Sequence, residues 1–222
     1  MRAYMESLFY VIYLVFIITI GVVLLIKSKD KKALFYFGLG AIILGFGDAF
    51  HLVPRSVGLF TKTLDNPSEV LASWLGIGKL ITSITMTIFY LLFYLFIYKR
   101  INKERNKVLD IIVSLLVLSR IVLCSLPGNG WLVNSSNLLW GTIRNIPFVI
   151  LGVLVIVLSF IHLRNVKPYK LLYLMIILSF AFYLPVVFLA STYSWVGMMM
   201  LPKTICYMII GFLGYKDLKQ GE

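Results

Sequence analysis

Residues 8–26 read LFYVIYLVFIITIGVVLLI, and the loop that follows, residues 27–32, reads KSKDKK. The apolar run contains no charged side chain, and a helix of this length can cross the roughly 30 Å of hydrocarbon in a bilayer. The run lacks the small-residue cleavage site of a secretory signal peptide. We therefore expect it to remain in the protein as a first transmembrane helix.

The same pattern recurs along the whole chain. The 222 residues are 60% hydrophobic and only 14% charged, a composition that soluble domains avoid because they need a polar surface. Apolar stretches of membrane-spanning length lie at approximately residues 8–26, 33–53, 71–98, 108–126, 138–162, 171–190 and 195–215. The sequence thus predicts an all-α, polytopic membrane protein, with residues 1–222 forming a single domain of seven transmembrane helices and no soluble domain.

The distribution of basic residues predicts the orientation. The formal net charge is +12, and loops 27–32, 99–107 and 164–170 are rich in Lys and Arg, whereas loops 127–137 and 191–194 carry none. Basic loops are typical of the cytoplasmic side of a membrane protein. We expect the N-terminus outside, the C-terminus in the cytoplasm and a multi-pass location in a plasma membrane. This reading also explains the basic composition without nucleic-acid binding.

Two predicted helices begin alike, with SWLG at residues 73–76 and SWVG at residues 194–197, and each carries a Lys one to two turns deeper. Two parallel three-helix bundles joined by the fourth helix would produce such a repeat. The 3+1+3 layout with an external N-terminus resembles the topology of SWEET-type sugar carriers and PnuC-type vitamin carriers. The resemblance is one of topology only, and it implies transport of a small solute.

Charged residues within the predicted spans mark a candidate site. Counted at 1.5 Å per residue from the outer ends of their helices, they lie at one depth, roughly 9–12 Å below the outer boundary. These residues are Asp48, Lys79, Arg120, Arg144 and Lys203. A charge that faces lipid at that depth costs several kcal/mol, so we expect the side chains to face the bundle interior. His51 shares a helix face with Asp48 and completes the predicted ligand-binding set.

The predicted layer holds four cations and one carboxylate. One cation can pair with Asp48 and simply lock helices together, but the others need water, helix carbonyls or an anion. We therefore predict a transporter or binding protein for a small anionic or zwitterionic solute. The cations would hold the anionic group, and Asp48 and His51 would recognise a donor group.

Three other functions remain open. An intramembrane enzyme acting on a lipid or phosphate-bearing substrate would use Asp48 and His51 as an acid–base pair. A photoreceptor of the retinal type is a lesser alternative, because Lys203 lies partway along the last helix as the Schiff-base lysine of rhodopsins does. A sensory membrane protein would act through a protein partner. No metal or cofactor is predicted, since His51 and His162 lie near opposite membrane faces and cannot build the zinc site of seven-helix hydrolases.

Two short sequence segments show a further resemblance. GDAFHLVPR at residues 47–55 and IRNIPF at residues 143–148 are similar to segments of uncharacterised seven-helix membrane proteins of Gram-positive bacteria. The resemblance favours a bacterial plasma membrane and implies no particular activity.

Overall fold

The computed structural model describes residues 2–28, 31–64, 66–133, 138–189 and 193–220, which contain helices and no strand. The α-helices are α1 (Arg2–Lys27), α2 (Lys32–Phe60), α3 (Glu69–Arg100), α4 (Lys107–Ser125), α5 (Leu138–Leu163), α6 (Leu172–Leu189) and α7 (Met200–Gln220). Short 3-10 helices form η1 (Pro127–Asn129), η2 (Trp131–Val133), η3 (Tyr169–Leu171) and η4 (Ser194–Met199).

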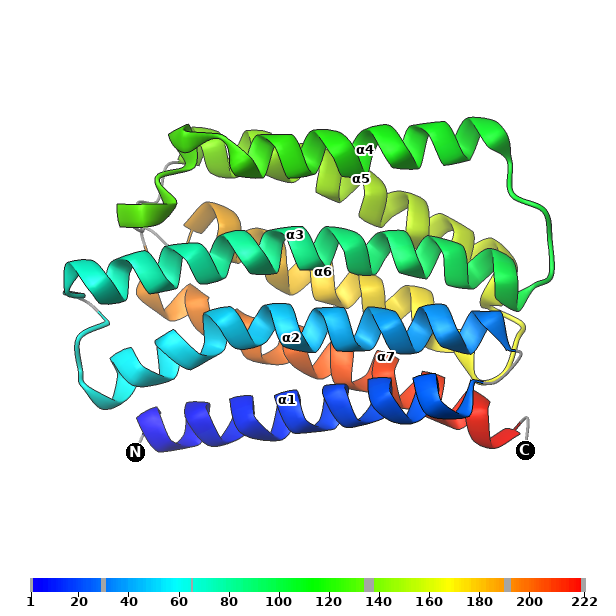
Figure 1. The fold of residues 1–222 in the computed structure, drawn as a ribbon, viewed down its shortest axis with the longest axis horizontal. Coiled ribbons are helices and arrows are strands. Elements are labelled where there is room, and N and C mark those ends of the chain that lie inside the picture. The colour runs from blue at the N-terminus through cyan, green and yellow to red at the C-terminus, as the bar shows by residue number, and fades with distance from the viewer. Residues whose placement is uncertain (1, 29–30, 65, 134–137, 190–192, 221–222) are drawn as a thin grey trace.

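Seven helical segments are long and apolar enough to cross a membrane. They lie side by side and run in alternating directions, so that the bundle has two distinct ends (Figure 1). We call the end at which α1 begins the amino end and the end at which α7 finishes the carboxy end. The chain is therefore a helical bundle suited to a multi-pass membrane location, as the apolar runs predicted.

Helices α1 and α2 are longer than the sequence predicts, and α1 begins at Arg2 instead of residue 8. The predicted end of the second span, Val53, is wrong, because α2 continues through Pro54 to Phe60. Proline removes the N–H that would bond to the carbonyl of Phe50, but its φ angle fits a helix. That carbonyl lies against α3, where a Cβ added to Gly78 would be 2.3 Å from the Phe50 oxygen. The extra turns bring Arg55 alongside α1.

The last span begins at Trp195, as predicted, but its first turns form a 3-10 helix. Ser194–Met199 form η4, and the α-helix α7 begins at Met200. Pro202 therefore lies in the first turn of α7, where its missing N–H has no intrahelical acceptor to lose. At the other end α7 continues to Gln220, beyond the predicted end at residue 215.

Aromatic rings fill the carboxy half of the bundle. Phe93 and Phe96 of α3 are fully buried, as are Phe37 of α2 and Tyr169 of η3. The ring centroids of Phe37 and Phe96 are 5.0 Å apart in an edge-to-face arrangement, a geometry that aromatic pairs prefer. Between Met86 and Tyr98 most residues of α3 are buried. The interior of this half is closely packed.

The amino half is more open. Residues 79–85 of α3 and 182–187 of α6 all keep part of their surface exposed, whereas Ser179 and Phe180 deeper in α6 are buried. A helix at the lipid boundary exposes one stripe of residues and buries the opposite one. Exposure on every face means that the inward face of α6 is also incompletely covered here.

Candidate functional site

The predicted site residues all lie in the amino half, and we call them the amino-half cluster. They come from α2 (Asp48 and His51), α3 (Lys79), α4 (Arg120), α5 (Arg144) and α7 (Lys203). Lys203 interacts electrostatically with both Asp48 and His51. Lys79 interacts with His51 and Arg144, and Arg144 interacts with Arg120. The charges thus form a connected series from α7 to α4.

Lys203 is the buried cation at one end of this series. Its side chain is 8% exposed, and Nζ lies 4.9 Å from the ring centroid of Tyr183 and 5.6 Å from that of Tyr207. Asp48 accepts a hydrogen bond of 2.6 Å from the Tyr13 hydroxyl of α1. Within the described residues Asp48 and Lys203 do not form a direct ion pair. Aromatic faces stabilise the ammonium group by modest cation–π attraction, but they carry no negative charge.

Arg120 and Arg144 also find partners that are not carboxylates. Arg120 donates a hydrogen bond to the carbonyl of Arg144, and its Cζ lies 5.1 Å from the ring centroid of Phe148. Arg144 donates to Asn129 Oδ1 over 2.8 Å, and its Cζ lies 4.3 Å from the ring centroid of Trp131. Neither guanidinium group forms an ion pair with a carboxylate of the described chain, and together they join α4, α5 and the intervening connection.

The partners of Arg144 are fixed by the end of α4. Asn129 Nδ2 donates hydrogen bonds of 2.8 Å to the carbonyls of both Leu123 and Leu126. Trp131 Nε1 donates a bond of 2.7 Å to the carbonyl of Cys124. These bonds satisfy carbonyl groups that a helix C-terminus leaves without intrahelical partners. The α4–α5 connection thus holds the Arg144 side chain in one place.

His51 and Lys79 complete the amino-half cluster. His51 Nδ1 is buried and has no hydrogen-bond partner in the described part of the chain. Positive charge surrounds it, from Lys79, Arg55 and Lys203. Although Asp48 lies one turn away on the same helix, no hydrogen bond joins it to His51 among the described residues, since Asp48 accepts from Tyr13 on α1. The structure brings the two residues near each other without forming the acid–base pair.

A second network near the amino end was not predicted. Arg55 donates hydrogen bonds to the Tyr10 hydroxyl over 2.9 Å and to Glu6 Oε2 over 3.3 Å, and the Tyr10 hydroxyl donates to the same Glu6 oxygen over 3.0 Å. Glu6 lies before the predicted first span at residue 8, so the sequence does not indicate an intramembrane carboxylate here. The spacing of Glu6 and Tyr10, one helical turn, was the available signal. Arg55 is neutralised by this carboxylate.

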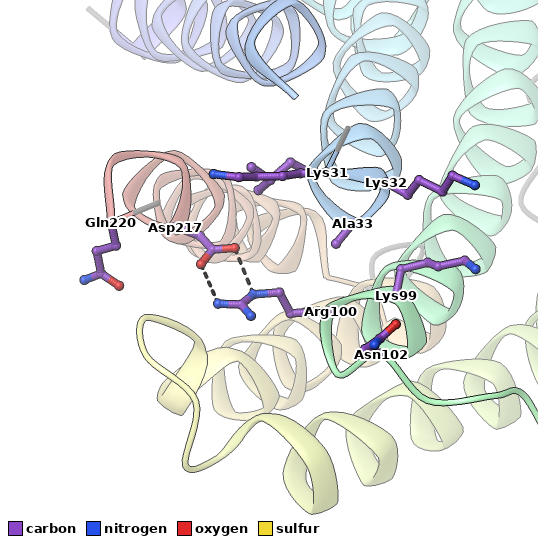
Figure 2. Close-up of a pocket in the computed structure, with 9 residues that line it drawn as sticks. Lys31, Lys32, Ala33, Lys99, Arg100, Asn102, Asp217 and Gln220 are labelled. Carbon is purple, nitrogen blue, oxygen red and sulfur yellow. Dashed lines mark hydrogen bonds and ion pairs between the residues drawn. The ribbon is translucent and has the colours of Figure 1, made fainter. Parts of the chain in front are cut away.

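The carboxy end contains a different charged pair. Arg100 Nε donates to Asp217 Oδ2 over 3.0 Å and Arg100 Nη2 donates to Oδ1 over 2.8 Å, as Figure 2 shows. The Tyr169 hydroxyl donates to Oδ2 of the same carboxylate over 3.1 Å. Asp217 lies beyond the predicted last span, residues 195–215, and is part of α7 with 8% of its surface exposed. The bidentate pair joins the ends of α3 and α7.

The described residues contain no group of three or more His, Cys, Asp and Glu side chains that could hold a metal ion. Cys124 and Cys206 are free and buried. No protein-family model, curated protein or solved structure matches the chain. The likeness to SWEET- and PnuC-type carriers and to membrane proteins of Gram-positive bacteria stays a prediction.

Proposed function

We propose that the chain is a transporter or binding protein for a small anionic or zwitterionic solute, which it takes up at the amino-half cluster. In this proposal the amino end lies outside a bacterial plasma membrane and the carboxy end lies in the cytoplasm. The observation that carries the proposal is the state of Lys203, a buried ammonium group that contacts two aromatic rings and no carboxylate within the described chain.

A solute anion would supply the charge that the cluster lacks. Buried cations are costly without a partner, and a carboxylate or phosphate that reaches Lys203 gains charge-assisted bonds as it removes that cost. Lys79 and Arg144 lie further along the same electrostatic series and would strengthen the attraction. Asp48 would accept from the ammonium group of a zwitterion. His51 Nδ1 offers a second polar contact.

The packing on either side of the amino-half cluster supports entry from the amino end. Toward that end, the inward surfaces of α3 and α6 are incompletely covered. Toward the carboxy end, the Tyr90 and Tyr207 hydroxyls lie 3.3 Å apart, and the Tyr90 ring packs edge-to-face against Phe148 at 5.3 Å between centroids. This aromatic layer would separate the solute from the cytoplasm. Release to that side would require the layer to open.

Prolines inside two helices supply positions at which such a movement can occur. Pro147 lies within α5, three residues after Arg144, and Pro185 lies within α6, two residues after Tyr183. Each removes one backbone hydrogen bond from its helix, and helices bend preferentially at such positions.

The enzyme alternative has less support. Acid–base catalysis needs donor and acceptor groups within hydrogen-bond reach of the reacting atoms. Asp48 accepts a hydrogen bond from Tyr13 of the adjacent helix α1, and the described residues contain no hydrogen bond between Asp48 and His51. The geometry therefore favours binding of an anion over proton transfer.

Thermal unfolding of the purified protein in nanodiscs tests the proposal. The protein would be heated with a panel of carboxylates, phosphates and zwitterions, beside Lys203→Met and a control, Lys62→Asn. Lys62 is an exposed cation at the same end, and its positive φ of 57° is one that Asn tolerates. A ligand at about 100 times its Kd stabilises the folded state by about 2.7 kcal/mol, which gives a measurable rise in Tm.

We expect one class of anion to raise the Tm of the wild type and of Lys62→Asn but not that of Lys203→Met. The proposal would be contradicted if no anion or zwitterion raised the Tm, or if the stabilisation were the same in Lys203→Met as in the wild type.

A further inference from the structure

A cavity of about 730 Å³ opens at the carboxy end, far from the amino-half cluster. It lies between the start of α2, the end of α3 and the end of α7 (Figure 2). Its walls include Lys31 and Lys32 of the α1–α2 region, Lys99 and Arg100 of α3, and Asp217 of α7. Among the described residues of the wall, four are cations and one is a carboxylate.

That carboxylate is already engaged. Asp217 accepts two hydrogen bonds from Arg100 and a third from Tyr169. Lys32 and Lys99 both point away from this pair in Figure 2, toward the same side of the view. Within the described part of the chain neither lysine forms an ion pair with a carboxylate. Their ammonium groups remain available to an anion from outside the chain.

The first turn of α2 adds to this positive charge. Lys31 at the N-cap makes no side-chain capping bond, and Ala33 and Leu34, which follow it, also line the cavity. The first N–H groups of a helix have no intrahelical acceptors, and the helix dipole places partial positive charge at this end. Backbone and side chains therefore favour the same kind of guest, an anion with several oxygen acceptors.

We propose that this cavity binds the phosphate group of an anionic phospholipid from the adjacent leaflet. The cavity lies where three spans end, at the level at which headgroups meet protein, and basic pockets between transmembrane helices are suited to such headgroups. Apolar side chains at the same end, Ile26 (75% exposed) and Phe35 (44% exposed), offer contacts for the acyl chains. The inference is independent of the solute proposed for the amino half.

Native mass spectrometry tests the proposal directly. Purified protein would be titrated with phosphatidylglycerol or with phosphatidylcholine, and the dissociation constant of the first bound lipid would be measured. The variant Lys32→Gln/Lys99→Gln removes two cations from the cavity wall. The control Lys103→Gln/Lys170→Gln removes two exposed cations from the same end outside that wall. Lys32→Arg/Lys99→Arg keeps the charge.

We expect the wild type, the control and the Arg variant to bind one phosphatidylglycerol in preference to phosphatidylcholine. The Gln variant of the cavity should bind it on the order of tenfold more weakly, since each basic residue near a headgroup contributes a severalfold gain in affinity. Equal affinity for the two lipids in the wild type would overturn the proposal, as would equal loss in the control. Inorganic phosphate that competes at the concentration of the lipid would instead identify a soluble phosphate compound, which also overturns it.

Discussion

The carboxy end and the amino-half cluster treat buried charge differently. At the carboxy end Arg100 and Asp217 neutralise each other through two hydrogen bonds, of 3.0 and 2.8 Å. In the amino half Lys203 rests on tyrosine rings, and Arg144 on Trp131 and an amide oxygen. An anionic ligand gains little binding free energy from a cation that is already paired with a carboxylate. It gains more from a buried cation that contacts only neutral groups. The first arrangement is suited to joining helices and the second to binding.

The largest expected effect comes from breaking the carboxy-end pair. Arg100→Gln leaves the Asp217 carboxylate buried with the Tyr169 hydroxyl as its one remaining side-chain donor among the described residues. Removing one partner of a buried ion pair costs about 3–5 kcal/mol, and we expect a value near the lower limit because Arg100 is 31% exposed. Unfolding in mixed micelles at increasing denaturing detergent would measure the loss.

Arg105→Gln is the matched control for this change. Arg105 pairs with Asp110 over 3.6 Å, but the two side chains are 43% and 32% exposed. Exposed ion pairs contribute about 0–1 kcal/mol, so this variant should unfold nearly as the wild type does. If Arg100→Gln were equally harmless, or if Lys203→Met cost as much as Arg100→Gln, the contrast between the carboxy-end pair and the amino-half cluster would be lost.

A smaller effect is expected where α2 crosses α3. A Cβ at Gly78 would lie 2.3 Å from the carbonyl oxygen of Phe50 and 2.8 Å from the Cα of His51, so Gly78→Ala must push two backbones apart. Overpacking of this kind costs about 1–3 kcal/mol. The same unfolding assay would show it, and a shift of His51 would also weaken anion binding. Because α3 packs against the α2 backbone at Gly78, the amino half is open on the other side of α3, which faces α6.

Gly141→Ala is the control for that crossing. A Cβ at Gly141, inside α5, would meet nothing within 4 Å. Alanine favours a helix over glycine by about 0.5–1 kcal/mol, so this variant should be as stable as the wild type or slightly more stable. A similar loss from both glycine variants would contradict the close α2–α3 approach.

Sequence alone predicted the spans well, because bilayer thickness fixes the length of an apolar run. It failed at Pro54, where a residue that often ends helices is accommodated beside Gly78. It also excluded Glu6, because the first apolar run begins after it. Both errors concern residues whose positions depend on contacts with a neighbouring helix. The sequence of one apolar segment does not predict such contacts.

The position of the site residues in one half of the bundle was predictable in the same way, since residue counting places a side chain along its helix. Their partners were not predictable. That Arg120 bonds to the carbonyl of Arg144, or that Lys203 lies over Tyr183, depends on which helices are adjacent and how each is rotated. The charge imbalance is visible in the sequence, but its compensation by rings and carbonyls appears only in three dimensions.

The most direct test of the account is the reactivity of a cysteine at Ser83, one turn below Lys79 on the partly exposed stretch of α3. Ser83→Cys would be made with Cys124 and Cys206 replaced by Ser, and treated from the amino side with anionic and cationic thiosulfonate reagents. Ser73→Cys, near the amino end of α3, serves as the reference outside the cluster. It gives the ratio of the reaction rate with the anionic reagent to the rate with the cationic reagent. Ser179→Cys gives the background, since Ser179 is 1% exposed.

We predict that Ser83→Cys reacts and that its ratio of anionic to cationic rate exceeds the ratio at Ser73→Cys, because the local positive potential concentrates anions. Ser179→Cys should not react. A cysteine at Ser83 that is as unreactive as one at Ser179, or that shows no preference for the anionic reagent, would contradict an open, cationic amino half.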